Sequence, residues 1–180
     1  MKQHHLIYLI GFMASGKTSV GRKLAKKLAV DFLDLDFLIE ENERMSISRI
    51  FEVKGEVYFR AKEAELLRNI SKKNKCIVAL GGGTACHSNN MKYINSTGLS
   101  VYLKRSNQRL LGRLRQKKAK RPLIANLSDI ELKSFIDKKM EERVPFFEEA
   151  RWVINADAFT RKNDLIHYIE DRIGEGDANF

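Results

Sequence analysis

Residues 11–18 read Gly11-Phe12-Met13-Ala14-Ser15-Gly16-Lys17-Thr18, which matches the phosphate-loop pattern G-x-x-x-x-G-K-[ST] in full. An apolar run at 6–10 precedes this stretch, and apolar residues at helical spacing follow it at Val20, Leu24 and Leu28. Strand, glycine loop and helix is the context in which this pattern binds a triphosphate. The alternative is a tight turn before an ordinary helix, which the context disfavours. We therefore predict a nucleoside triphosphate site.

In such a loop, the backbone N–H groups and the helix N-terminus attract the phosphates. The lysine reaches the β- and γ-phosphates, and the hydroxyl after it can ligate Mg²⁺. We accordingly expect ATP and Mg²⁺ as ligands, with Thr18 on the metal. The residues of this segment expected to bind the nucleotide are Gly11, Ala14, Ser15, Gly16, Lys17, Thr18 and Ser19.

The chain has 180 residues, of which 43% are hydrophobic and 31% charged. We predict one domain over 1–174 and a frayed tail over 175–180. Membrane insertion is not expected, because no apolar run approaches the roughly eighteen residues that a membrane span needs. The chain passes from its first residues into the first strand without a signal peptide, and its two cysteines, Cys76 and Cys86, do not suggest a disulfide framework. These features favour the cytoplasm.

The formal net charge of +10 has two interpretations. Basic patches give proteins non-specific affinity for nucleic acid. A pocket for a triphosphate and an anionic substrate, with further lysines on solvated helix faces, also accounts for it. The basic residues are scattered, apart from a cluster at 117–121, and no aromatic residues interleave with them as a base-stacking surface requires. We expect no nucleic-acid partner.

Strands and helices are predicted to alternate along the chain, which favours a parallel sheet covered on both faces. Pro122 closes a basic stretch without apolar periodicity, which we interpret as a mobile surface loop. Pro145 is expected to kink or end its helix. The predicted strands are 6–10, 30–34, 76–80, 99–103 and 151–155. The predicted helices are 17–29, 36–45, 56–73, 88–95, 106–115, 128–149 and 160–173.

Two carboxylates end the second predicted strand, Asp34 and Asp36. Ligands bind parallel sheets at the carboxyl ends of the strands, so this pair could serve metal and substrate. We assign Asp34 to Mg²⁺, through water, and Asp36 to the hydroxyl that is phosphorylated. The alternative is that one or both cap the helix that begins near residue 36. The third strand ends without an acid, in Gly81-Gly82-Gly83, whose backbone can approach a ligand closely or can form an ordinary strand–helix turn.

Arginines supply candidate anion contacts. Arg60 and Glu63 lie one helical turn apart, either as a surface ion pair or as a carboxylate-binding arginine oriented by the glutamate. Arg121, beside Pro122, could close on the β- and γ-phosphates and stabilise transition-state charge. Arg143 on the next helix is a second candidate anion clamp, with an ordinary surface role as its alternative.

Together these segments resemble the shikimate kinase family over about residues 5–170. The phosphate loop is shared with many nucleotide-binding proteins, whereas the spacing of the other motifs is far more specific. The resemblance rests on Gly11–Thr18, Leu33-Asp34-Leu35-Asp36, Gly55-Glu56 with Phe59-Arg60-Ala61-Lys62-Glu63, Gly81-Gly82-Gly83 and Lys120-Arg121-Pro122-Leu123. It implies a three-layer α/β/α P-loop kinase fold with a five-stranded parallel sheet of order 2-3-1-4-5, a substrate-binding region at about 35–63 and a lid at about 114–127.

The resemblance also implies the reaction and the roles of residues. The γ-phosphoryl group of ATP passes to the 3-hydroxyl of shikimate, with Lys17, Asp36 and Arg121 catalytic and Arg113 beside the adenine. Substrate contacts fall to Asp36, Arg60, Glu63, Gly81, Gly82, Gly83 and Arg143, and metal contacts to Thr18 and Asp34.

One departure follows Arg143, where Phe147 stands in place of the family's usual tyrosine and removes a hydroxyl. We expect a monomer that acts in aromatic amino-acid biosynthesis. The alternatives are another polyhydroxy-acid kinase, such as a gluconate-type enzyme, and a nucleotide-binding regulator that has lost catalysis.

Overall fold

The computed structural model describes residues 6–70, 75–116, 118 and 122–177. Its centre is a five-stranded sheet in which every neighbouring pair is parallel, in the order β2-β3-β1-β4-β5. The predicted order 2-3-1-4-5 is therefore confirmed. The strands are β1 (Leu6–Ile10), β2 (Asp31–Asp34), β3 (Cys76–Ala79), β4 (Leu99–Lys104) and β5 (Trp152–Asn155).

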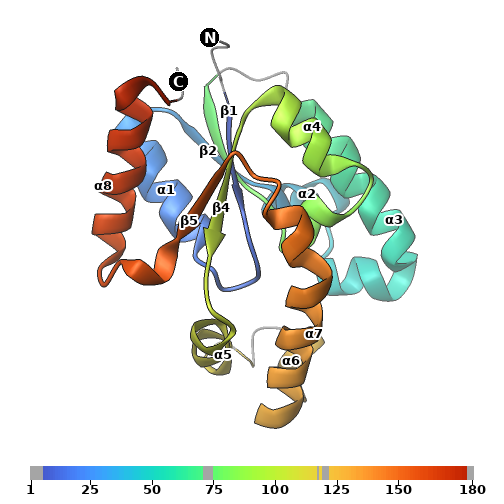
Figure 1. Cartoon of the computed structure of the whole chain (residues 1–180). Coiled ribbons are helices and arrows are strands. Elements are labelled where there is room, and N and C mark those ends of the chain that lie inside the picture. Colours follow the sequence, from blue (N-terminus) through green and yellow to red (C-terminus); the bar gives the residue numbers. More distant parts are fainter. Residues whose placement is uncertain (1–5, 71–74, 117, 119–121, 178–180) are drawn as a thin grey trace.

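Both faces of the sheet are buried, which explains why β1 is apolar throughout. Leu6, Tyr8 and Ile10 point into one hydrophobic cluster, whereas Ile7 and Leu9 point into the other. Figure 1 shows the helices on the two sides of the sheet. One side carries α1 (Lys17–Leu28) and α8 (Lys162–Arg172), and the other carries α2 (Leu35–Glu43), α3 (Ile47–Ile70), α4 (Asn90–Thr97) and α7 (Asp129–Phe147).

One helix boundary was predicted wrongly. The sequence pattern placed a helix at 56–73, but α3 begins at Ile47 and contains a kink at Gly55 (φ 79°, ψ 171°). This left-handed backbone suits glycine, which has no Cβ to clash. The segment before the kink is short and its first turn is capped by side chains: Glu40 accepts the N–H of Ile47, and Ser46 accepts that of Arg49. The spacing of apolar residues along the sequence does not report such capping hydrogen bonds, so it could not predict the start of this helix.

The other predicted helices and strands lie near their predicted positions, and the elements that were not predicted are short. Pro145 lies in the last turn of α7, which ends at Phe147, in agreement with its expected effect. Of the predicted lid, 117 and 119–121 lie outside the described residues, as does 178–180 of the predicted tail. The remaining elements are α5 (Asn107–Arg115), α6 (Pro122–Ala125) and short turns η1 (Thr84–Cys86), η3 (Ala156–Ala158) and η4 (Ile173–Asp177).

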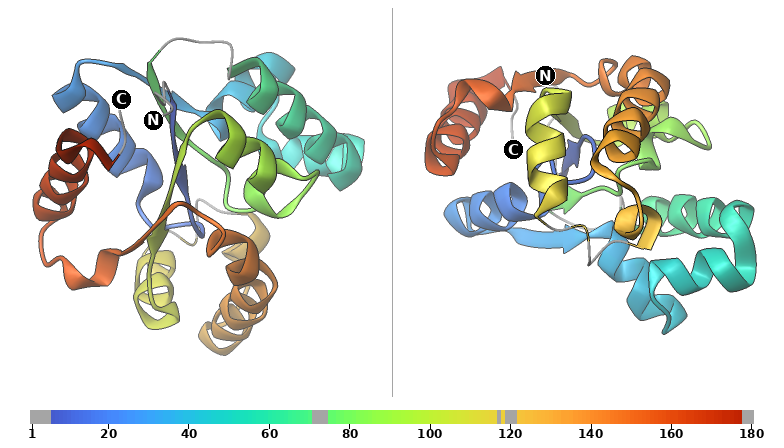
Figure 2. Two further views of the ribbon diagram at one scale, coloured as in Figure 1. Left: turned by 45° about the horizontal axis from the view of Figure 1, so that its top comes forward. Right: turned by 90° about the horizontal axis from the view of Figure 1, so that it is seen from below.

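The carboxyl ends of the strands lie at one end of the molecule, onto which the right panel of Figure 2 looks. The phosphate loop follows β1, Asp34 ends β2, and the three glycines follow β3. Because β3 and β1 are neighbours at the centre of the sheet, these segments meet there. In the described part of the chain, no helix combines the length and the apolar character needed to cross a membrane.

Candidate active site

The phosphate loop holds its own lysine. The Nζ of Lys17 donates to the carbonyl oxygens of Gly11 (2.8 Å) and Phe12 (2.9 Å), and the residue is buried. Ser19 donates its hydroxyl to the carbonyl of Gly16, which is the N-cap of α1. The loop therefore presents a buried ammonium group and the N-terminus of a helix at one place, which is the arrangement expected for binding phosphates.

Thr18 and Asp34 lie together, as the magnesium hypothesis requires. The Thr18 hydroxyl donates to Oδ2 of Asp34 over 2.7 Å. Asp34 is the N-cap residue of α2 but makes no side-chain capping hydrogen bond, so the capping alternative does not describe it. A hydroxyl and a carboxylate are hard oxygen donors, which fit Mg²⁺ held mainly by water and phosphates.

A pocket of about 420 Å³ opens over the loop. It brings together predicted residues from the carboxyl end of β2 and from the segments that follow β1, β2 and β3, including Lys17, Thr18, Asp34, Asp36 and Gly82. Arg113, predicted to lie beside the adenine, also lines it and donates to the carbonyls of Ala14 (3.1 Å) and Ser15 (3.3 Å). Arg121 lies outside the described residues.

Sequence reasoning missed a second arginine that supports the loop. Arg105 donates through Nε to the carbonyl of Ser15 (2.8 Å) and forms an ion pair with Asp157 (2.8 Å). Asp157 also accepts hydrogen bonds from the backbone and hydroxyl of Ser106. The available signal was position, since Arg105 directly follows β4, the strand beside β1. Gln116 and Lys162 line the pocket as well, and no sequence signal marked them.

Asp36 lies in the first turn of α2, and its carboxyl is a weaker acid than usual. Burial and then the negative charge of Asp34 raise the pKa of Asp36 from 3.8 to about 6, against the opposing effect of Lys17. It is not the N-cap of α2, and it faces the pocket. A carboxylate that is partly withdrawn from water beside a phosphate-binding lysine is well placed to accept a proton or hydrogen bond from a substrate hydroxyl.

Arg60 and Glu63 form a buried ion pair, so the surface-pair alternative is wrong. The side chain of Glu63 is 1% exposed and that of Arg60 is 15% exposed. Arg60 donates through one terminal nitrogen to Glu63 (2.9 Å) and through Nε and the other to Glu56. It also lies over the ring of Phe59, at 5.0 Å from the ring centre. The guanidinium is therefore held in place before any ligand arrives.

The glycines after β3 allow the two acidic groups to approach each other. A Cβ added to Gly81 would lie 2.6 Å from Oδ1 of Asp36 and 2.9 Å from Oε1 of Glu63, which no real Cβ tolerates. A Cβ on Gly83 would lie 3.1 Å from the Arg60 guanidinium. The turn is therefore packed directly against the predicted substrate residues, which an ordinary strand–helix turn need not be.

Arg143 reaches the same turn from α7. It donates to the carbonyl of Gly82 over 3.1 Å and lies over the ring of Phe12. Burial, together with the positive charge of Arg60, lowers the pKa of Arg143. Two guanidinium groups that repel each other mark a place where an anion is favoured. The structure thus gathers all predicted substrate residues around Gly81–Gly83.

Comparison with known proteins agrees with this geometry. The family model for shikimate kinase matches residues 13–173. A shikimate kinase of Flavobacterium psychrophilum is 43% identical over 153 residues, covering 84% of this chain and 89% of the relative.

Solved structures give the same result. A crystal structure of shikimate kinase from Bacteroides thetaiotaomicron matches with a TM-score of 0.90 and 33% identity, over 94% of this chain and 98% of that one. The shikimate kinase of Acinetobacter baumannii in complex with shikimate matches with a TM-score of 0.84 and 32% identity, over 94% and 93% of the two chains. The chain therefore belongs to the shikimate kinase family of ATP-dependent enzymes.

Proposed function

We propose that this chain transfers the γ-phosphoryl group of ATP to the 3-hydroxyl of shikimate at the pocket between the phosphate loop and the Gly81–Gly83 turn. The observation that carries the proposal is the juxtaposition of Asp36 with Lys17 in one pocket. One group accepts from a hydroxyl and the other binds the phosphate that the hydroxyl attacks. The similarity to an enzyme solved in complex with shikimate supports the choice of acceptor.

The acceptor carboxylate is assigned to Arg60 and Arg143. Both guanidinium groups lie against the Gly81–Gly83 turn, and their mutual repulsion would be relieved by an anion between them. Asp36 lies beside Gly81 and takes the hydroxyl. A ring with a carboxylate at one end and hydroxyls at the other fits this separation of charges.

On the nucleotide side, Lys17 would exchange its hydrogen bonds to the loop carbonyls for bonds to the β- and γ-phosphates. Thr18 and, through water, Asp34 would hold Mg²⁺. When bound, the metal neutralises charge on the phosphates. The nucleobase is assigned to the hollow next to the phosphate pocket, which Arg113 and Phe159 line. Arg121 keeps its proposed role as the lid arginine. Phosphoryl transfer passes through a loose transition state. Positioning of the reactants and neutralisation of phosphate charge therefore matter more than full removal of the proton from the substrate hydroxyl.

The direct test is ADP release from ATP by the purified chain, measured with shikimate or gluconate and with or without Mg²⁺. We expect release that requires both shikimate and Mg²⁺. Release with gluconate in place of shikimate would move the proposal to another acceptor. ATP binding without turnover on either acid would indicate a regulator instead, and salt-dependent binding to single-stranded nucleic acid would support that role.

We further propose that the enzyme acts as a cytoplasmic monomer. The assigned nucleotide and acceptor groups all come from one chain, and both cysteines are free thiols, as suits a reducing compartment that supplies ATP. Sedimentation at working concentration tests the monomer, and a second copy in the sedimenting species would contradict it.

A further inference from the structure

Glu63 divides its carboxylate between two partners. Oε2 accepts from Arg60 at 2.9 Å, and Oε1 accepts from the hydroxyl of Thr84 at 2.6 Å. Thr84 is fully buried, and Glu63 is 1% exposed. The second distance is in the range of strong O–H···O⁻ hydrogen bonds. The buried carboxylate is therefore fixed at both oxygens, once by the arginine and once by the threonine.

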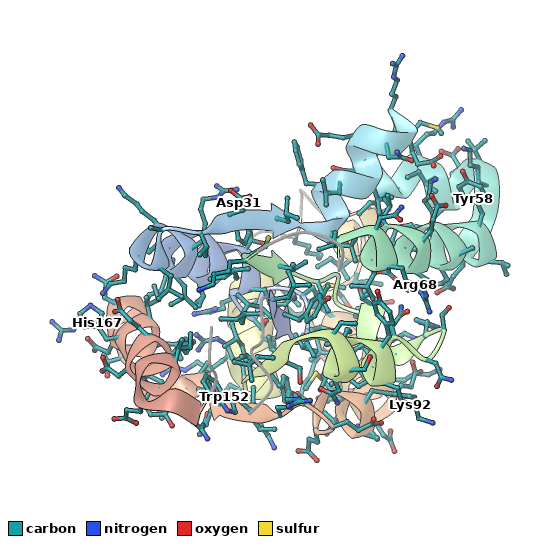
Figure 3. The ribbon with its side chains drawn as sticks, turned by 90° about the horizontal axis from the view of Figure 1, so that it is seen from above. Asp31, Tyr58, Arg68, Lys92, Trp152 and His167 are labelled. Carbon is teal, nitrogen blue, oxygen red and sulfur yellow. The ribbon has the colours of Figure 1, made fainter. Side chains whose placement is uncertain are left out.

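Thr84 is itself fixed from two directions. Its N–H donates to the carbonyl of Gly81, and its carbonyl accepts from the side-chain amide of Asn90 at 2.9 Å. Asn90, at the start of α4, is fully buried and also lies 3.4 Å from a terminal nitrogen of Arg68. Figure 3 shows Arg68 on α3, the helix that carries Glu63. Helix α3 and the β3–α4 connection are thus joined at two points.

We propose that Thr84 is a positioning residue for the acceptor site: its hydroxyl holds Glu63 in the orientation in which Glu63 holds Arg60 against the substrate carboxylate. The inference rests on the role proposed above for Arg60. The terminal torsion of a glutamate is broad and weakly restricted. Without a donor on Oε1, the carboxylate keeps only one of its two restraints, and its hydrogen bond to Arg60 is less well oriented.

The same hydrogen bond places Glu63 relative to Asp36. Oε1 of Glu63, Oγ1 of Thr84 and Oδ1 of Asp36 would all lie within 2.9 Å of a Cβ on Gly81. The hydroxyl of Thr84 therefore donates to the oxygen of Glu63 that lies nearer to Asp36, the acid assigned to the substrate hydroxyl. Displacing it disturbs both ends of the proposed acceptor site, but it leaves the phosphate loop untouched.

The test compares Thr84→Val, which removes the hydroxyl at similar volume, with Thr84→Ser, which restores it. We expect Thr84→Val to raise KM for shikimate about tenfold, the cost of one lost hydrogen bond to a charged group. KM for ATP should stay within about twofold, and Thr84→Ser should return KM for shikimate to within about twofold of the wild type. Thr97→Val is the matched control, because Thr97 bonds to Tyr8 and Tyr93 away from the site.

A purely structural role predicts a different outcome. In that case Thr84→Val lowers the unfolding temperature but changes both KM values alike, and this result overturns the proposal. Thr84→Ala is measured in parallel, since it places no methyl group beside the carboxylate and keeps the comparison available if the valine variant does not fold.

A shikimate analogue with a carboxamide in place of the carboxylate separates the two layers of the argument. Wild-type enzyme should prefer the carboxylate, and Thr84→Val should lose most of that preference. Full preference retained in Thr84→Val overturns the role of Thr84 alone. No preference in the wild type overturns the role of Arg60, and the role of Thr84 with it.

Discussion

The two halves of the site are built differently. On the nucleotide side, Lys17, Arg105 and Arg113 all donate to backbone carbonyls of residues 11–15, so the loop is held by side chains bonded to main chain. On the acceptor side, Arg60, Glu63 and Thr84 bond to one another, side chain to side chain. The first half is centred on the backbone of one short segment, the loop at 11–15. The second is centred on a network of side chains.

This difference predicts where each half is vulnerable. A backbone carbonyl stays in place when a neighbouring side chain changes, so the loop should tolerate single substitutions around it. A side-chain network fails as a unit when one member is removed. Substitutions on the acceptor side should therefore affect shikimate and leave ATP binding intact, and the predictions below test that separation.

The largest effect is expected for Asp36→Asn. The amide carries no charge and cannot accept the proton, so the substrate hydroxyl loses both its orientation and its acceptor, and such groups contribute about 10²–10⁴-fold to rates. We expect kcat to fall by about a thousandfold, measured by ADP release, while the Kd for ATP changes by less than about threefold. Asp31→Asn is the control, because Asp31 is an exposed aspartate on β2, the strand that directly precedes α2. Full turnover in Asp36→Asn would show that the assigned acceptor site is wrong.

Arg60→Ala should come next, with two separable consequences. Losing the guanidinium should lower kcat/KM for shikimate by about a hundredfold. It also leaves Glu63 buried without its cation, which should lower the free energy of unfolding by about 3 kcal/mol.

The double variant Arg60→Ala/Glu63→Gln sharpens this test of Arg60. Removing the buried charge should recover stability in chemical denaturation but not activity. Arg49→Ala, which breaks an exposed pair with Glu52, is the control and should cost less than about 1 kcal/mol. If the double variant regains activity, Arg60 serves stability rather than substrate binding.

The same difference decides how much could be predicted from the sequence. The phosphate loop and the acids at the end of β2 follow from local patterns, and residues 11–18 and Asp34 lie where those patterns placed them. Arg60 and Arg143 were candidates from the residues themselves, whereas the family resemblance supplied the sheet order and the assignment of both arginines to the shikimate carboxylate. Thr84, Asn90 and Arg105 were missed because their roles depend on partners 21, 6 and 90 residues away. No spacing rule reports such pairings.

A smaller effect is expected in the pH dependence of stability. The pKa of Asp36 rises from 3.8 to about 6 on folding, so between these values the folded state binds more protons than the unfolded state. Stability should therefore fall as the pH rises from about 4 to about 6, and the full penalty applies above that range. It amounts to on the order of 3 kcal/mol.

Asp36→Asn removes this penalty, so it should unfold at a higher temperature than the wild type at pH 7.5, by roughly 6–12 °C. The difference should vanish near pH 3, below both pKa values, where the wild-type carboxyl is protonated in both states. Activity of the wild type should decline as the pH falls through about 6. If the wild type and Asp36→Asn unfold at equal temperatures at both pH values, the ionised carboxylate of Asp36 does not lower the stability of the fold.

The smallest effect is expected at Phe147, where the family resemblance led us to expect tyrosine. Phe147 is fully buried, and its ring centre lies 5.1 Å from that of Tyr102 on β4. Phe147 therefore packs in the core, one helical turn after Arg143. It is Arg143 that bonds to Gly82 at the acceptor site. Phe147→Tyr should leave KM for shikimate within about twofold and lower stability by about 1 kcal/mol, because a buried hydroxyl is added without a designed partner. A marked fall in KM would instead place this ring at the acceptor. The acceptor site would then extend one turn further along α7, from Arg143 to Phe147.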